Sequence, residues 1–209
     1  MTDLTEMSEP RAQLNVKADP TRPITPDELD DLLQQSWAPS DFAILIRRVN
    51  ATNGWRPNHT PAQAFADIHE LLNLTHTEIS EAYREGDPHL HVLELGDVIV
   101  RAADLCTLIA PDAPLPGHLL DGAYPIGDRL QWLLGLHAHI DDATQAWRKA
   151  TSNEQARPML LEDLHHLIRH THYLIAAHAS HTRLTSRRVL GQVLQKNIQR
   201  GHRHGGRRA

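Results

Sequence analysis

The sequence predicts an all-α protein, a helical bundle of antiparallel hairpins, and two observations indicate this. No segment alternates apolar and polar residues with a period of two, whereas several long segments place apolar residues at i, i+3 and i+4. Hydrophobic residues make up 40% of the 209 residues but aromatic residues only 4%. The core must therefore consist mainly of Leu, Ile, Val and Ala, which suits packed helices better than a β-sandwich.

The N-terminal region, residues 1–24, is polar and contains three prolines, so we expect a loose arm there. A single domain over 25–200 should follow. It begins with Thr25-Pro26-Asp27-Glu28, where Thr as N-cap, Pro at the first helical position and Glu at the third are typical of a helix start. This helix should reach about Trp37 and end before Pro39.

A second helix is expected over about 41–53, capped by Ser40 or Asp41 and ended by Asn53-Gly54. Its apolar residues fall at helical spacing, and they are Phe42, Leu45, Ile46 and Val49.

A long helical hairpin is predicted over 61–110. Thr60-Pro61-Ala62-Gln63 repeats the capping signature and opens a helix to about Glu85, which Gly86 closes. A second long helix should run from about Pro88 to Ala110. Because the turn between the two helices is so short, we expect them to pack antiparallel.

The C-terminal half predicts a second hairpin. Residues 111–125 are rich in Pro and Gly and should form a loop. Long helices are expected over about 126–150 and 156–181, and a last helix over about 186–200. Residues 201–209 form a basic tail.

Two pairs of acids lie on the first hairpin. Glu78 and Glu81 are three residues apart and share a helix face, as do Glu94 and Asp97 on the next helix. The second helix is apolar almost all round except for a stripe that includes these acids. Antiparallel packing would bring the two pairs together across the helix interface.

Four clustered carboxylates need compensation by raised pKa values or by a cation. Oxygen ligands favour a hard ion, Mg²⁺ or Mn²⁺, which proteins commonly share with substrate phosphates. The alternative is two solvated helix faces carrying ordinary i, i+3 acids.

The same acids carry a resemblance to a family. Glu78-Ile79-Ser80-Glu81 and Glu94-Leu95-Gly96-Asp97 resemble the paired E-x-x-E and E-x-x-D signature of MazG-like nucleoside triphosphate pyrophosphohydrolases. That family consists of all-α bundles that split nucleoside triphosphates into monophosphate and pyrophosphate with Mg²⁺. The resemblance covers about 41–110 and 187–207, and it implies that all four acids hold the metal.

The resemblance also implies substrate contacts. Asn197-Ile198-Gln199-Arg200 and His204-Gly205-Gly206-Arg207 resemble the C-terminal Asn-x-x-Arg and His-Gly-Gly-Lys segment associated with the nucleotide end of the family's site. Arg207 replaces the usual Lys, and Val193 stands where a helical Lys is expected, with Lys196 nearby. The residues to which the resemblance and the local chemistry give a substrate-binding role are Trp55, Arg101, Asp104, Lys196, Asn197, Arg200 and His204.

The implied reaction is attack by water on a phosphorus of the triphosphate, with the metal neutralising phosphate charge. Glu78 or Glu81 would be the general base, and the sequence does not separate them. Arg101 could hold phosphate oxygens, or could instead pair with Asp97 or Asp104 on its own helix. Two other functions stay open: a phosphoribosyl-ATP pyrophosphohydrolase-like activity, and a non-catalytic helical interaction protein that keeps the fold.

The hairpin over 126–181 reads like a weak repeat of the first one. Aligning the two places Glu78 against Asp142 and Asp97 against His165. We therefore consider an internally duplicated MazG-like four-helix core with one catalytic and one degenerate hairpin. The alternative is that any two amphipathic hairpins would align this well.

Composition limits the partners. A net charge of −5 argues against a general nucleic-acid-binding surface, although the chain from Arg183 onward is Arg-rich and contains no acid. No apolar run approaches the roughly 20 residues that span a bilayer, and the N-terminus does not resemble a signal peptide. We expect a cytoplasmic protein that binds a nucleoside triphosphate, contacts neither membrane nor nucleic acid, and forms a homodimer as relatives usually do.

Overall fold

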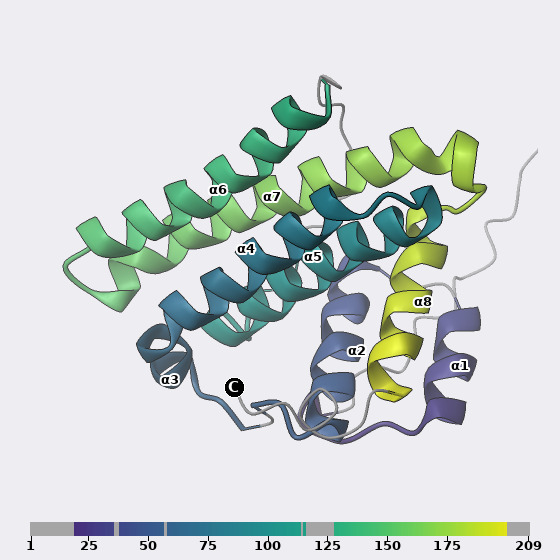
Figure 1. Ribbon diagram of the computed structural model, residues 1–209. Helices are drawn as coiled ribbons and strands as arrows, with labels where there is room; N and C mark the ends of the chain where they lie inside the picture. The colour runs from purple at the N-terminus through teal and green to yellow at the C-terminus, as the bar shows by residue number, and fades with distance from the viewer. Residues whose placement is uncertain (1–18, 36–37, 57, 114, 116–127, 200–209) are drawn as a thin grey trace, which may run out of the picture.

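The computed structural model describes residues 19–35, 38–56, 58–113, 115 and 128–199. These residues form eight α-helices and no strand, which confirms the all-α prediction (Figure 1). In chain order the helices are α1 (Pro26–Gln34), α2 (Pro39–Thr52), α3 (Pro61–Ala66), α4 (Ile68–Arg84), α5 (Pro88–Ile109), α6 (Arg129–Lys149), α7 (Asn153–Thr182) and α8 (Ser186–Gln199). None of the described helices combines the length and apolarity that crossing a bilayer requires.

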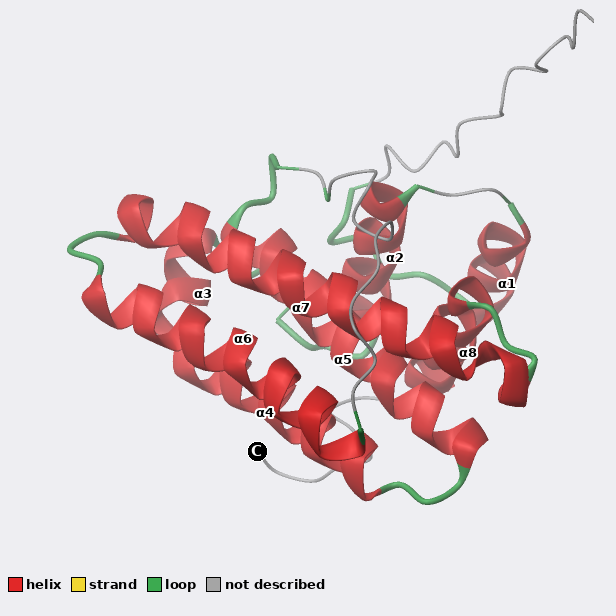
Figure 2. Cartoon of the chain, turned by 90° about the horizontal axis from the view of Figure 1, so that it is seen from above, coloured by secondary structure: helices red, strands yellow, loops and turns green. Residues whose placement is uncertain are grey.

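Helices α4 to α7 form a bundle of two antiparallel hairpins. In this bundle α5 packs against α4 and α7, and α6 packs against the same two helices (Figure 2). Helix α5 is central because it is apolar almost all round, and 15 of its 22 residues are buried. Helices α6 and α7 are 21 and 30 residues long, whereas α4 and α5 are 17 and 22 residues long. That mismatch counts against a duplication, which stays a prediction.

A second group of helices packs across the bundle. Helices α2 and α8 contact α5, and α1 contacts α8; Figure 1 shows the three crossing the direction of the bundle. Helix α8 approaches α5 closely at Gly96, where a Cβ atom would lie 2.8 Å from Cγ2 of Val193 and 2.9 Å from Cγ1 of Val189. Glycine at this position therefore lets α8 pack directly against the part of α5 that carries Glu94 and Asp97.

The boundary between the first two helices differs from the prediction. Pro39 begins α2 as its first residue, with Ala38 as N-cap, and the expected caps Ser40 and Asp41 lie inside the helix. Proline is well placed there because the first helical N–H has no partner within the helix. The Asp41 carboxylate accepts a hydrogen bond from the Ala38 N–H at 2.8 Å. The first helix ends at Gln34, before the expected end at about Trp37, because the backbone of Gln35 is extended.

Two other helices also differ from their predicted ranges. The helix expected over 60–85 is two helices that meet at Asp67, whose carboxylate contacts His59 at 2.9 Å and Arg56 at 3.4 Å. The backbone hydrogen bonds continue on both sides of this interruption, from the Asp67 N–H to the Gln63 carbonyl and from the Leu71 N–H to the Asp67 carbonyl. Helix α7 begins at Asn153, three residues before the prediction, and Pro158 lies inside it.

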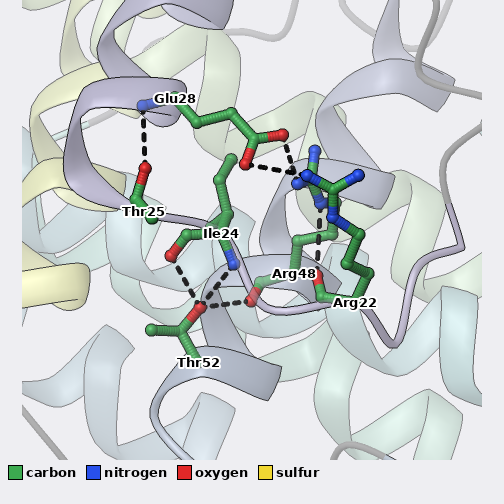
Figure 3. Close-up of polar contacts among 6 residues, drawn as sticks. All are labelled: Arg22, Ile24, Thr25, Glu28, Arg48 and Thr52. Carbon is green, nitrogen blue, oxygen red and sulfur yellow. Dashed lines mark hydrogen bonds and ion pairs between the residues drawn. The ribbon is translucent and has the colours of Figure 1, made fainter.

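The chain before α1 is anchored on α2, as Figure 3 shows. Ile24, the last residue of the expected loose arm, is only 2% exposed, and its N–H donates to Oγ1 of Thr52 at 2.8 Å. Arg48 is equally buried, and it reaches the Glu28 carboxylate at 2.5 Å and the Arg22 carbonyl at 3.2 Å. This polar contact ties the start of α1 to α2.

Candidate metal centre

Three glutamates converge between α4 and α5. Glu78 and Glu81 lie one turn apart on α4, and Glu94 comes from α5. One carboxylate oxygen from each lies within 4.8 Å of the others, and no other group of this kind occurs in the described chain. The turn that pairs the helices is fixed by Asp87, whose carboxylate caps α5 by accepting from the N–H groups of His89 and Leu90.

Glu78 lies at the inner side of this group. Its side chain is 14% exposed, and Oε1 accepts a hydrogen bond from Nε of Arg101 at 3.0 Å. Burial raises the pKa of Glu78; Arg101 opposes this shift, while the charges of Asp97 and Glu81 add to it. The net direction is upward, because desolvation and like charges outweigh a single guanidinium.

Glu81 and Glu94 form the outer side. Together with Arg84 and Glu85 they line a surface pocket of about 280 Å³. Glu81 is exposed, so a ligand can reach its carboxylate from solvent.

Asp97, the fourth predicted metal ligand, lies outside the group of three. It is 4% exposed. Its Oδ2 lies 2.5 Å from Nζ of Lys196, and its Oδ1 accepts a hydrogen bond from Nδ2 of Asn197 at 3.3 Å. Lys196 also lies 3.8 Å from Oε1 of Glu94. Lys196 of α8 thus pairs with Asp97, the residue that the sequence predicts as the fourth metal ligand, and lies next to Glu94.

Arg101 contacts α4, and not Asp97 or Asp104 on its own helix as one of the two alternatives predicted. Its partner is Glu78, and its guanidinium carbon lies 5.8 Å from the centre of the Trp55 ring. The Arg56 guanidinium lies 4.8 Å from the same ring. Trp55 therefore stands beside the acidic group, joined to it through Arg101.

Asp104 lies in the interior, which argues against the nucleotide contact implied by the resemblance. It is 3% exposed and pairs with Nη1 of Arg47 at 2.9 Å. Nη2 of Arg47 donates to the Arg56 carbonyl at 2.6 Å. This pair holds the segment that carries Trp55. Arg47 could not be predicted from the sequence, because helical periodicity does not distinguish a buried arginine from a solvated one.

The last turn of α8 is anchored beside the acids. Nδ2 of Asn53, a second residue missed from sequence, donates to the Asn197 carbonyl at 2.7 Å. Lys196 lines a pocket of about 550 Å³ with Gln192, Gln195 and Gln199. Arg200 and His204 lie outside the described residues.

The donor set fits a hard divalent cation. The three converging side chains offer oxygen atoms only, which Mg²⁺ and Mn²⁺ prefer. Oδ1 of Asn197, beside Asp97, is buried and has no hydrogen-bond partner among the described residues. A buried acceptor of this kind would be satisfied by a bound water or by a cation.

Comparison with family models, curated proteins and solved structures found no match to this chain. The functional assignment therefore depends on the residues themselves.

Proposed function

We propose that this protein is a Mg²⁺-dependent, MazG-like pyrophosphohydrolase that converts a nucleoside triphosphate, ribo or deoxyribo, to the monophosphate and pyrophosphate. The observation that carries the proposal is the convergence of Glu78, Glu81 and Glu94 within 4.8 Å on adjacent helices. Two like charges 4 Å apart repel by about 4 kcal/mol at an effective dielectric near 20. A divalent cation removes that repulsion, and Mn²⁺ should replace Mg²⁺.

The three glutamates would hold the ion. When bound, Mg²⁺ would neutralise phosphate charge and help to position the attacking water. Glu81 is the favoured general base, because its carboxylate is exposed in the pocket while that of Glu78 is engaged by Arg101. Trp55, Arg101, Lys196 and Asn197 surround the group and are the proposed nucleotide contacts, together with Arg200 and His204.

The test is pyrophosphate release from a panel of ribo- and deoxyribonucleoside triphosphates, with and without Mg²⁺. Glu81→Gln should abolish release while leaving the helical circular dichroism intact, since the amide removes a metal ligand and a base without changing shape. Glu162→Gln is the matched control. It is an exposed acid on α7, outside the group, and should retain wild-type activity.

Full activity in Glu81→Gln would refute the site. Release from phosphoribosyl-ATP but from no other substrate would favour the related activity. A wild-type protein without turnover on the whole panel would favour a non-catalytic interaction protein.

A further inference from the structure

Three contacts hold α8 in place, two with α5 and one with the end of α2. Gly96 lets Val193 and Val189 approach the α5 backbone closely. Asn53, the C-cap of α2, holds the Asn197 carbonyl. The Asn197 amide in turn donates to Asp97. The backbone that carries Lys196 therefore has one position relative to the acids.

The ion pair between Lys196 and Asp97 is asymmetric. The Lys196 side chain is 28% exposed, whereas that of Asp97 is 6% exposed. Lys196 can release its ammonium group to water with little cost, but Asp97 would be left as a buried charge without compensation. Another cation must therefore replace Lys196 if it leaves. The nearest place for one is the group of Glu78, Glu81 and Glu94, because Lys196 also lies 3.8 Å from Glu94.

We propose that Lys196 is the counter-ion of the carboxylate site in the metal-free protein, where it pairs with Asp97 and lies beside Glu94, and that it competes with a divalent cation for these two carboxylates. Metal binding displaces the ammonium group and releases the Asp97 carboxylate toward the ion. This explains why Asp97 lies outside the converging group although its spacing from Glu94 predicts a ligand. The inference rests on the proposed function only in taking the three glutamates as a metal centre.

The experiment is calorimetric titration of Mn²⁺ into the metal-stripped, nucleotide-free protein at fixed pH and ionic strength. Lys196→Met keeps the apolar stem and removes the charge. It should lower the Kd for Mn²⁺ by roughly tenfold, because the ion no longer has to displace a positive charge that lies beside Glu94 and Asp97. Lys149→Met, an exposed lysine at the end of α6, is the matched control and should leave the Kd unchanged.

Two further measurements guard against a folding defect. Lys196→Gln keeps a hydrogen-bond donor for Asp97 without the charge and should tighten Mn²⁺ binding in the same direction. In the wild type, Mn²⁺ should increase amide hydrogen exchange in the last turn of α8, and in Lys196→Met this increase should be absent.

The outcomes separate the two proposals. Mn²⁺ binding that is lost in Glu81→Gln but equal or weaker in both folded Lys196 variants would overturn the counter-ion role and leave the metal centre standing. Absence of Mn²⁺ binding in the wild type and in both Lys196 variants would overturn the metal centre and the counter-ion role together.

Discussion

At the scale of single residues, the interior charges of this protein are compensated by partners from distant helices. Arg47 pairs with Asp104, 57 positions away, and Asp97 pairs with Lys196, 99 positions away. Such pairs contribute less to stability than their geometry suggests, because both ions lose water. Their larger effect is that a buried partner cannot lose its counter-charge without a large cost.

Asp104→Asn should therefore destabilise the fold strongly. The substitution leaves the Arg47 guanidinium buried without a counter-charge, which typically costs about 3–5 kcal/mol. Urea unfolding followed by circular dichroism measures the loss. Glu70→Gln, which removes an exposed partner of Arg56, is the control and should cost less than about 1 kcal/mol. Equal losses in the two variants would contradict this account of Arg47.

At the scale of elements, the site depends on how closely helices approach α5. Helices α4 and α8 both deliver site residues to it, and Gly96 sets the distance to α8. Because protein interiors are close-packed, even one methyl group at such a contact must move a neighbour.

Gly96→Ala should push α8 away from α5. The added Cβ would lie under 3 Å from two valine methyl groups. Overpacking of this kind typically costs about 1–3 kcal/mol, which outweighs the gain of about 1 kcal/mol in helix propensity. Thermal unfolding tests this against Gly86→Ala, where a Cβ would meet nothing within 4 Å. An unchanged melting temperature in Gly96→Ala would contradict this, because it would show that α8 accommodates the added methyl group without a loss of stability.

At the scale of the whole molecule, histidines packed between helices link stability to pH. The chain has 16 histidines, and burial lowers the pKa of His91, His137, His139 and His170. For His139, burial and then the neighbouring His170 and His166 lower the pKa to about 4, against the opposing charge of Asp142. The folded protein therefore keeps this ring neutral over a range in which the unfolded chain binds a proton.

Stability should fall on acidification. Between pH 6.5 and about 4 the unfolded chain binds the extra proton of His139, so the free energy of unfolding decreases as pH falls through this window. Asp163 acts in the opposite direction, because burial and the charges of Asp142 and Glu162 raise its pKa to about 6. His139→Gln should reduce the loss of unfolding free energy between pH 7 and pH 5 by on the order of 1 kcal/mol, allowing for solvent screening. Urea unfolding at pH 7 and pH 5 measures this, and an identical loss in both proteins would contradict it.

The sequence by itself determined the helices and the pairing that carries the site. Thr25, Thr60 and Asp87 mark helix starts because capping is local, and the short turn at Gly86 dictates an antiparallel hairpin. The apolar surface of α5 interrupted by acids predicted that Glu78, Glu81 and Glu94 would meet. All of these signals lie within a few residues of the feature that they predict.

Only the tertiary structure decided what surrounds the acids. The partner of Asp97, the buried pairing of Asp104 and the contact of Arg101 with Glu78 depend on residues far apart in sequence. The contacts of Asp67 with His59 and Arg56, at the point where α3 meets α4, likewise join residues that helical periodicity does not pair. Periodicity reports which face of a helix is buried but not which residue lies opposite. Which residues of two helices face each other is therefore decided only when the helices pack in the tertiary structure.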